Sequence, residues 1–413
     1  MAMLDPVRSA LVRAVAPKNV RRIDAASFGR RASGFGTVNR VSSEVASSAA
    51  TARRRAQYLA ANNPHIANAV DNWVAALVGT GITPSGDPEQ VHAFNTWAES
   101  CDFDGRTNIL GILIAIVRDM IVAGEGLGRF VVTDRGLKFQ QIPPELLDES
   151  KTAELSNGGF VINGVEFDAS GQRVAYWILP AKPTDQLAAY AAPVRVDASE
   201  ILHVFRAIGA GQVRGLSWLA PVIVPASELD AIVDALAVGV KVAALHAGFI
   251  VDQNGSAGLP IDGEQIGSAL EGGLEPGTLR VLPSGFDVKF SSPQQASETA
   301  AFLTFQLRML AAGLGLPEHL LSGDLSQANY SSLRAGLLPF RARAEQIQES
   351  VLIPQLLNPV WRRVMLLESL SGNVGEVAPV EWLPPRWAQV DPLKDTEATI
   401  LEIHPQEDAL FVI

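Results

Sequence analysis

The chain has 413 residues, of which 47% are hydrophobic and 19% are charged, and its formal net charge is -11. This balance supports a large buried core spread over two or three domains and excludes a chain that is disordered throughout. The single cysteine, Cys101, excludes an intrachain disulfide and a zinc site built on paired cysteines.

Charge is divided unevenly along the sequence. Residues 1–55 carry eleven Lys and Arg residues against three acidic residues, so this stretch is +8 and the rest of the chain is -19. A basic arm on an acidic body predicts an arm that contacts an anionic partner. A solvated flexible tail and an arginine-rich transit peptide remain the alternatives.

Helical signals dominate the first part of the chain. Arg53 to Arg55 are expected in an ordered helix, and the next helix is expected to begin at Asn63, its N-cap, with Pro64 in the first turn. Further helices are predicted over residues 91–99 and from residue 107 or 108 to about 123.

Residues 109–123 form the most apolar window, which is too short for a bilayer span and is interrupted by Arg118 and Asp119. A buried helix is therefore expected there, with no membrane span and no secretory leader. Between Arg129 and Phe205, short β-rich runs separated by Gly, Pro and Asp predict strands, so the fold class is α+β (mixed).

Helix returns in the second half, over residues 229–250. The Gly-rich stretch that follows is predicted to hold a short helix at 264–270 and two strands, at 278–283 and 286–290. A helix over 297–312 is expected to stop at Gly313.

After a polar loop at 322–330, the strongest periodicity of the chain predicts a long helix over 333–353. Pro339 is a candidate kink in this helix, and Pro354 is expected to end it.

Motifs for catalysis are missing from the sequence. There is no P-loop and no pair of histidines at metal-ligand spacing, and the run Gly215 to Leu219 lacks the final glycine of a serine nucleophile elbow. The glycines at 124, 126 and 128 favour a tight helix-to-strand turn over a phosphate cradle. Cys101 is expected to be a buried, idle thiol. We therefore predict no catalytic residue, no metal and no cofactor, and a protein that is not an enzyme.

Several short runs, in order along residues 45–395, resemble the lambda-type family of tailed-phage portal proteins. They are Arg53 to Pro64 leading into Gly79-Thr80-Gly81; Phe94, Trp97, Asp102 and Gly105; Gln141-Ile142-Pro143; Gly164-Val165-Glu166 with Asp168 and Gly171; Ile201-Leu202-His203; Gly211 to Gly215; Leu282 to Gly285; Ala311 to Pro317; Leu321 to Asp324; and Asn329 to Ala335. The resemblance implies a ring of subunits, usually twelve, at one capsid vertex. Double-stranded DNA is packaged and ejected through such a ring.

The resemblance also implies a division of the subunit into wing, stem, clip, tunnel loop and crown. Carried onto this chain, the parts are a basic flexible N-terminal arm (1–50), wing (51–228), first stem helix (229–250), small α/β clip (251–295), second stem helix (296–312), tunnel loop region (313–332), long kinked wing helix (333–370) and a C-terminal segment (371–413). Because the family commonly continues beyond the point where this sequence stops, with the apolar run Leu410 to Ile413, a short or missing crown is expected.

Candidate sites follow from the same resemblance. The DNA channel and tunnel loop would use Ser322, Asp324, Ser326, Gln327, Asn329 and Tyr330; the clip would dock terminase or an adaptor through Asp252, Gln253, Asp262 and Glu264; and the arm would use Arg21, Arg22, Arg30 and Arg31. For the loop, the alternative is a cap on the next helix through Ser331 or Ser332. For the clip, a solvated rim explains the residues equally well.

The implied partners are other copies of the chain, double-stranded DNA, the terminase large subunit, head-completion or adaptor proteins, and the major capsid and scaffold proteins, with no membrane. The implied location is the portal vertex of a virion, and the host cytoplasm during assembly. A phage, a defective prophage and a gene transfer agent are all compatible sources. Two alternatives stay open: a structural protein with a fused or hidden hydrolase, and a monomeric DNA-binding protein that uses the basic arm.

Overall fold

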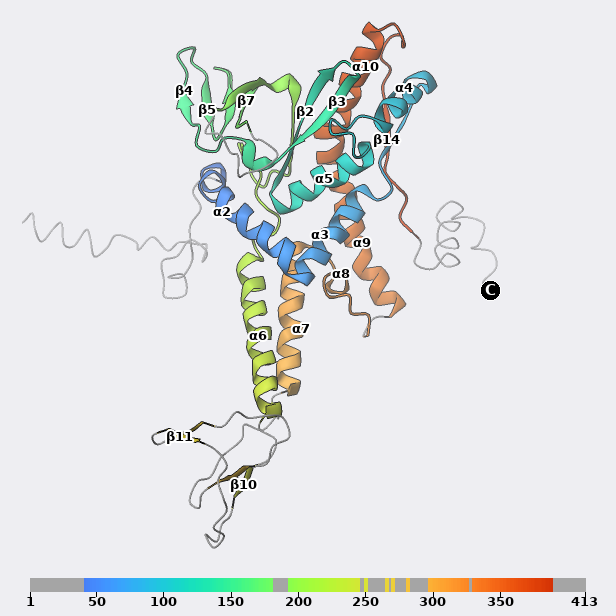
Figure 1. Cartoon of the computed structure of the whole chain (residues 1–413). Helices are drawn as coiled ribbons and strands as arrows, with labels where there is room; N and C mark the ends of the chain where they lie inside the picture. The colour runs from blue at the N-terminus through green and yellow to red at the C-terminus, as the bar shows by residue number, and fades with distance from the viewer. Residues whose placement is uncertain are drawn as a thin grey trace, which may run out of the picture.

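A two-helix stalk joins a mixed helical and sheet body to a small group of strands (Figure 1). The computed structural model describes residues 41–180, 192–245, 249–251, 264–266, 269–271, 280–282, 296–326 and 329–388. The predicted α+β class is confirmed.

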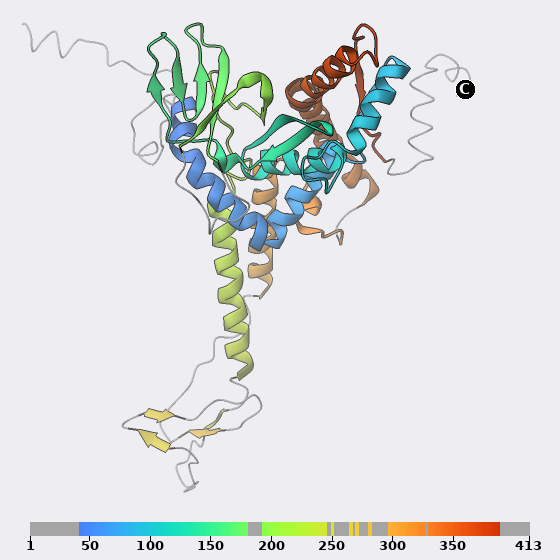
Figure 2. The same ribbon diagram turned by 45° about the horizontal axis from the view of Figure 1, so that its top comes forward.

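The stalk consists of α6 (Ile223–Leu245) and α7 (Ala296–Leu314), which lie side by side in both views (Figures 1 and 2). The prediction that helix continues to residue 250 is wrong, because β10 (Phe249–Val251) is a strand paired with β13 (Arg280–Leu282). An aromatic residue followed by two β-branched residues favours this extended pairing.

The end of α7 also differs from its prediction. Gly313 lies inside the helix, and Gly315, with φ +72°, follows its last residue. A Cβ at Gly313 would lie 2.5 Å from a Val222 methyl group, so this glycine allows the close approach of the segment that opens α6 and does not end the helix.

The short strands of the Gly-rich stretch lie beyond the far end of the stalk (Figure 1). Here β11 (Glu264–Ile266) pairs antiparallel with β12 (Ala269–Glu271), so the predicted helix at 264–270 is wrong. Hairpin pairing outweighs helical propensity over so few residues, because a helix of two turns has little cooperative support. β13 confirms part of the first strand prediction, and residues 286–290 lie outside the described part.

The helical side of the body is built from α2 (Val41–Asn62), α3 (Pro64–Val78), α4 (Pro88–Glu99) and α5 (Ile109–Val122). The predicted cap is confirmed: the Asn63 side chain accepts a hydrogen bond from the Ile66 amide at 2.9 Å. Asn108 caps α5 in the same manner, accepting from the Gly111 amide at 3.2 Å. These caps begin the helices where orphan amides need acceptors.

Two antiparallel sheets form the other side of the body and confirm the β-rich prediction. One has the order β3-β2-β9, from β2 (Glu125–Thr133), β3 (Gly136–Ile142) and β9 (Ile201–Phe205). The other runs in sequence order through β4 (Ala153–Glu154), β5 (Phe160–Ile162), β6 (Val165–Phe167), β7 (Arg173–Ile178) and β8 (Val194–Asp197). The short helical turns η2 (Pro144–Leu146) and η4 (Ala198–Glu200) connect the strands.

The predicted turn at the glycine cluster is confirmed, since Gly124, with φ +97°, joins α5 to β2. A Cβ on Gly124 would lie 2.4 Å from the Leu216 backbone, and one on Gly128 would lie 2.1 Å from the Phe139 ring. Close packing therefore requires glycine at these positions.

The predicted long helix is longer than expected. It runs as α9 (Tyr330–Ile347), the π-helix η6 (Gln348–Leu357) and α10 (Asn358–Leu370). Pro339 lies inside α9, and the prediction that Pro354 ends the helix is wrong, because Pro354 lies inside η6. Proline lacks an amide donor, and the widened hydrogen-bond pattern of a π-helix accommodates it.

The core lies where α3, α4 and the long helix meet. Trp73 packs against Phe340 with ring centroids 4.7 Å apart, and Phe94 packs against Trp361 at 5.3 Å. The chain returns after α10, where β14 (Glu381–Leu383) pairs with β1 (Thr83–Ser85) and Trp382 closes the core beside Phe94.

Candidate functional site

The loop that follows the stalk is fastened to the body by side-chain amides of α3. After α7 the chain forms the short helix α8 (Glu318–Ser322). Asn68 and Asn72 each donate a hydrogen bond of 2.9 Å to the Leu320 carbonyl oxygen, and Asn68 also donates to the Leu321 carbonyl at 3.1 Å. These bonds satisfy carbonyl oxygens at the end of α8 that lack helical partners.

Two further bonds fix the junction of α7 with this loop. The indole nitrogen of Trp73 donates to the Leu314 carbonyl at 3.1 Å, and Arg343 of α9 donates to the Gly315 carbonyl at 2.6 Å. Together with the asparagine contacts, these bonds tie the top of the stalk to α3 and α9.

Beyond α8 the loop is exposed and organised by local bonds. The Ser322 hydroxyl donates to the Glu318 carboxylate at 2.7 Å, and the Ser326 amide donates to Asp324 at 2.8 Å. Bonds from Ser326 hold the pKa of the Asp324 carboxyl below its ordinary value, so the carboxylate stays ionised near neutral pH. Leu325 is exposed between them.

The loop ends in a capping box. The Asn329 side chain accepts from the Ser332 amide at 2.9 Å, and the Ser332 hydroxyl accepts from the Asn329 amide at 3.1 Å. The capping alternative is thus confirmed for Ser332, with Asn329 as the N-cap. This cap does not exclude a channel role for the residues before it.

The stalk exposes apolar side chains over much of its surface. They are Val233, Val238 and Val240 on α6, and Phe302, Phe305 and Met309 on α7. Val240 is 69% exposed and Phe305 is 63% exposed. Exposed apolar side chains in such number on two paired helices indicate an interaction surface.

Inside the body, a charged network centres on Glu125, which is fully buried at the start of β2. Its carboxylate accepts hydrogen bonds from Arg53 at 3.1 Å, from the Arg214 guanidinium, from His203 at 2.8 Å and from the Gly215 amide at 2.9 Å. The network joins α2, β2, β9 and the loop after β9 in one place.

Electrostatics of this network follow from burial and pairing. Although burial alone would raise the pKa of Glu125, the charges and hydrogen bonds of Arg214 and His203 hold it well below its ordinary value. Burial lowers the pKa of His203. The basic stretch 1–55 was expected to contact an anionic partner. Arg53 cannot take part in such a contact, because it is buried in this network.

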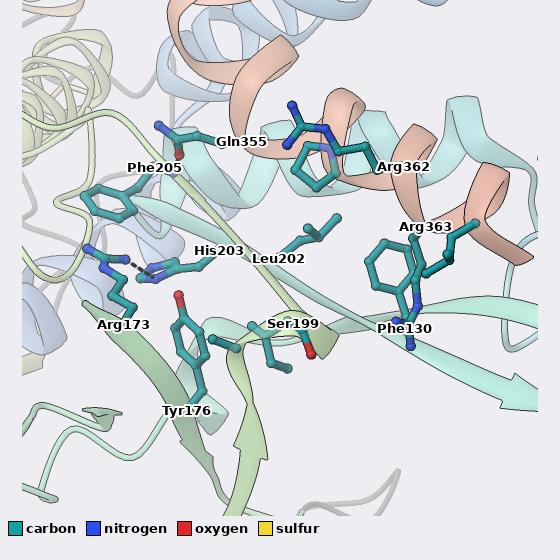
Figure 3. Close-up of a pocket in the computed structure, with 14 residues that line it drawn as sticks. Phe130, Arg173, Tyr176, Ser199, Leu202, His203, Phe205, Gln355, Arg362 and Arg363 are labelled. Atoms are coloured by element: carbon teal, nitrogen blue, oxygen red, sulfur yellow. Dashed lines mark hydrogen bonds between the residues drawn. The ribbon is translucent and has the colours of Figure 1, made fainter. Parts of the chain in front are cut away.

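An open cleft of about 690 Å³ lies between β9 on one side and η6 and α10 on the other (Figure 3). We call it the Arg-lined cleft, because Arg173, Arg362 and Arg363 line it beside apolar side chains. Gln355 reaches across one end and accepts a hydrogen bond from the Phe205 amide at 3.0 Å. Sequence reasoning missed this cleft; the available signal was the pair of adjacent arginines, Arg362 and Arg363, between apolar residues.

The structure describes only part of the predicted site residues. It places Ser322 at the end of α8, Asp324 and Ser326 in the exposed stretch after it, and Asn329 as the N-cap of α9, which Tyr330 opens. Glu264 lies in β11, whereas Gln327, Asp252, Gln253, Asp262 and the arm residues Arg21, Arg22, Arg30 and Arg31 lie outside the described residues.

Cys101 is buried, as predicted, and burial raises the pKa of its thiol to about 12. In the described part of the chain, no cluster of three or more His, Cys, Asp or Glu side chains could hold a metal ion. None of the described helices is both long enough and apolar enough to cross a membrane.

Comparison with known proteins gives one family and several relatives. The family described as "Phage portal protein, lambda family" matches residues 28–348. A "Probable portal protein" of Halomonas phage phiHAP-1 is 26% identical over 335 residues, which cover 77% of this chain and 64% of the relative.

Among solved structures, a chain in the neck of an empty GTA particle, determined with C6 symmetry, has a TM-score of 0.46 at 17% identity and covers 89% of this chain and 91% of that one. A chain in the virion of a native gene transfer agent (GTA) particle has the same score and coverage at 16% identity.

The family match over residues 28–348 covers most of the chain, including both helices of the stalk. This chain belongs to the lambda family of phage portal proteins. The chain spans 64% of the length of the curated relative it matches.

Proposed function

We propose that this chain is the subunit of a portal ring at one vertex of a capsid, through which double-stranded DNA is packaged and ejected. Family membership supports this role, and the exposed apolar surface of the stalk is the structural observation that carries it. In a ring, the stalk of each subunit lies beside the stalks of its neighbours.

Between Ile232 and Lys241, α6 has exposed residues around most of its circumference, and most of these residues are apolar. One neighbouring helix, α7, covers only one side of it (Figure 1). A helix that is apolar all round is stable in water only when further surfaces cover it. Copies of the same stalk on either side would provide that cover.

For DNA to move through the ring, the channel must bind the duplex only weakly. Each Lys or Arg that neutralises a phosphate releases counterions and adds affinity, so several such residues per subunit would hold the duplex in place. Residues 315–329 contain no Lys and no Arg, and burial lowers the pKa of His319, which favours its neutral form. We assign these residues, with Asp324 and Ser326 at the exposed tip, to the tunnel loop.

An acidic body supports the same role. Twelve copies of the chain would carry a formal charge of about -130, which repels phosphate and would keep a duplex centred. A continuous lining of Lys and Arg along the channel of the assembled ring would contradict this account.

The remaining assignments extend the proposal along the chain. The body would form the wing, α6 and α7 the stem, and the strands beyond the stalk the clip, which would dock the terminase large subunit and later an adaptor. The arm residues would contact capsid, scaffold or DNA. No catalytic role is proposed, since the family is structural.

Ring formation is the decisive test. Native mass measurement and negative-stain imaging of the purified chain should show closed rings with a central hole wide enough for a duplex. The substitution Val240→Glu should abolish rings while leaving the body folded, because it places a charge in the apolar stalk surface. Val132→Glu is the matched control, since Val132 is 66% exposed at the end of β2, away from the stalk.

A wild-type chain that stays monomeric would overturn the proposal. A monomer with strong, salt-dependent DNA affinity would instead favour the DNA-binding alternative, and a monomer with hydrolase activity would favour the enzyme alternative.

A further inference from the structure

One face of α2 is exposed and carries positive charge beside an aromatic ring. Arg53 is buried in the Glu125 network, whereas the next two residues, Arg54 and Arg55, are exposed. Tyr58 follows them by one helical turn, so it lies on the same face of α2, and it is 67% exposed. Arg54, Arg55 and Tyr58 are here called the cationic stripe.

The two arginines of the cationic stripe have no carboxylate partner among the described residues. Arg54 donates to the Ala50 carbonyl of its own helix at 3.3 Å, and the ion pairs of α2 in the described part of the chain are those of Arg53. Arginine and tyrosine are enriched at protein interfaces, where they supply large contact areas together with polar groups. The cationic stripe therefore has the composition of an interface and predicts an acidic partner surface.

An acidic surface lies on another part of the body, at α4, the β1–β14 pair and the turn after α10. Residues 79–105 contain five acidic residues and residues 364–385 contain three, and neither range contains Lys or Arg. Four of these carboxylates are exposed and form no ion pair with any described residue. They are Asp87, Glu89, Glu376 and Glu381, here called the acidic end.

Contacts within the body gather these carboxylates into one surface. The Gln90 side chain on α4 donates to the Glu376 carbonyl at 2.8 Å, and Glu381 on β14 pairs with Ser85 on β1. Two exposed apolar residues, Val377 and Leu383, accompany them. The acidic end thus combines carboxylates with apolar surface, as the cationic stripe combines guanidinium groups with a ring.

The two surfaces lie on opposite sides of the body. In both views α2 is on one side, and α4 and β14 are on the other (Figures 1 and 2). A ring with cyclic symmetry needs two different faces, because each copy presents one face to the copy before it and the other to the copy after it. A twofold dimer through the cationic stripe would instead place like charges together.

We propose that the cationic stripe of one copy docks on the acidic end of the next copy around the ring. Arg54 and Arg55 face the carboxylates of the neighbour, and the Tyr58 ring packs against its exposed apolar residues. This inference rests on the proposed ring, and it names the contact between the bodies of adjacent subunits, in addition to the contact between their stalks.

Charge reversal of each surface in the full chain tests this contact. The stripe-reversed variant carries Arg54→Glu and Arg55→Glu, and the end-reversed variant carries Glu376→Lys and Glu381→Lys. Because like charges then face each other, each variant alone should need about tenfold more protein than the wild type, or more, to form rings. Native mass measurement over a dilution series gives these concentrations.

Mixing the two variants in equal amounts should restore the rings. The stripe-reversed chain presents two acidic faces and the end-reversed chain presents two basic faces, so the two chains should alternate around each ring. Native mass measurement should find them in equal numbers. Such a rescue requires a contact between copies, because mixing cannot repair a contact within one chain.

The matched control carries Arg135→Glu and Arg362→Glu. It changes the net charge as much as the stripe-reversed variant does, at two exposed arginines of the β2 to β3 turn and of α10. This control should form rings at the same protein concentration as the wild type.

Three outcomes would overturn the proposed contact. The first is ring formation by either reversed variant at wild-type concentrations, and the second is a mixture that forms no rings. The third is an equal loss of rings in the control, which would assign the effect to net charge. In each case, wild-type rings that Val240→Glu abolishes would leave the proposed function standing, whereas a wild-type chain that forms no rings would overturn both.

Discussion

The substitution Glu125→Gln tests whether the buried network holds the body together. The wild-type carboxylate is fully buried and faces Arg53, Arg214 and His203. Glutamine keeps the shape of the side chain but removes its charge, so both arginines lose their central counter-ion. Glu149 remains, at 2.6 Å from Arg53 and 3.6 Å from Arg214.

The expected loss is about 3–5 kcal/mol of unfolding free energy, since removing one partner leaves buried charge uncompensated. Such a loss is a large share of the 5–15 kcal/mol that is typical of a folded domain. Asp71→Asn is the matched control. It breaks the Arg118 to Asp71 pair, which has a short contact of 2.6 Å but exposed side chains, so it should cost at most about 1 kcal/mol.

Urea denaturation followed by circular dichroism measures the difference in unfolding free energy between each variant and the wild type. Urea is suitable because it is uncharged and does not screen the ion pairs. The pH dependence supplies a second readout. Because the folded-state pKa of Glu125 lies below its unfolded value, its stabilisation is present above about pH 4.5 and is lost as the pH falls below that value. The Glu125→Gln variant should lack this acid dependence. A cost no larger than that of Asp71→Asn, with the acid dependence unchanged, would refute the reasoning.

Three further predictions concern single side chains. Burial raises the pKa of Asp119 to about 6, so the ionisation of this carboxyl destabilises the fold as the pH rises from about 4 to above 6. The unfolding free energy of Asp119→Asn should therefore rise by about 3 kcal/mol relative to that of the wild type between pH 4 and pH 7, measured by urea denaturation. A difference between the two proteins that does not change with pH would contradict this. Gly128→Ala should cost about 1–3 kcal/mol because its methyl group meets the Phe139 ring, whereas Gly375→Ala, in open space, should be near neutral by thermal melting. Asn329→Ala should cost about 1 kcal/mol by removing the cap of α9, measured by urea denaturation, and unchanged stability would refute the capping role.

Local signals in the sequence were sufficient for the starts of α3 and α5. Asn63 caps its helix as predicted, and Asn108, where a helix start was predicted at residue 107 or 108, is also an N-cap. A cap acts over three residues, so its chemistry can be recognised without the fold. The helix-to-strand turn at the glycine cluster could also be predicted, because the hydrophobic period changes after Gly124.

Long-range assembly could not be predicted in this way. Glu125 lies 72 residues from Arg53 and 89 from Arg214, and nothing in the sequence pairs them. The Arg-lined cleft likewise joins β7 and β9 to a helix about 150 residues later, as the bond from Phe205 to Gln355 shows. The π-helix around Pro354 was missed because tertiary packing, not local propensity, carries the helix past that proline.

Holding the loop after α8 firmly at its base has a mechanical consequence for the proposed channel. A loop that contacts a moving duplex through weak polar groups transmits little force at each contact, but the duplex passes many copies. The bonds from Asn68, Asn72 and Trp73 fasten one end of the loop to α3, and the capping box at Asn329 fastens the other end to α9. In the proposed channel, these bonds would pass a load on Asp324 or Ser326 to α3 and α9, which pack in the core of the body. Weak contact at the tip and strong attachment at the base are complementary requirements, and the two asparagines of α3 meet the second.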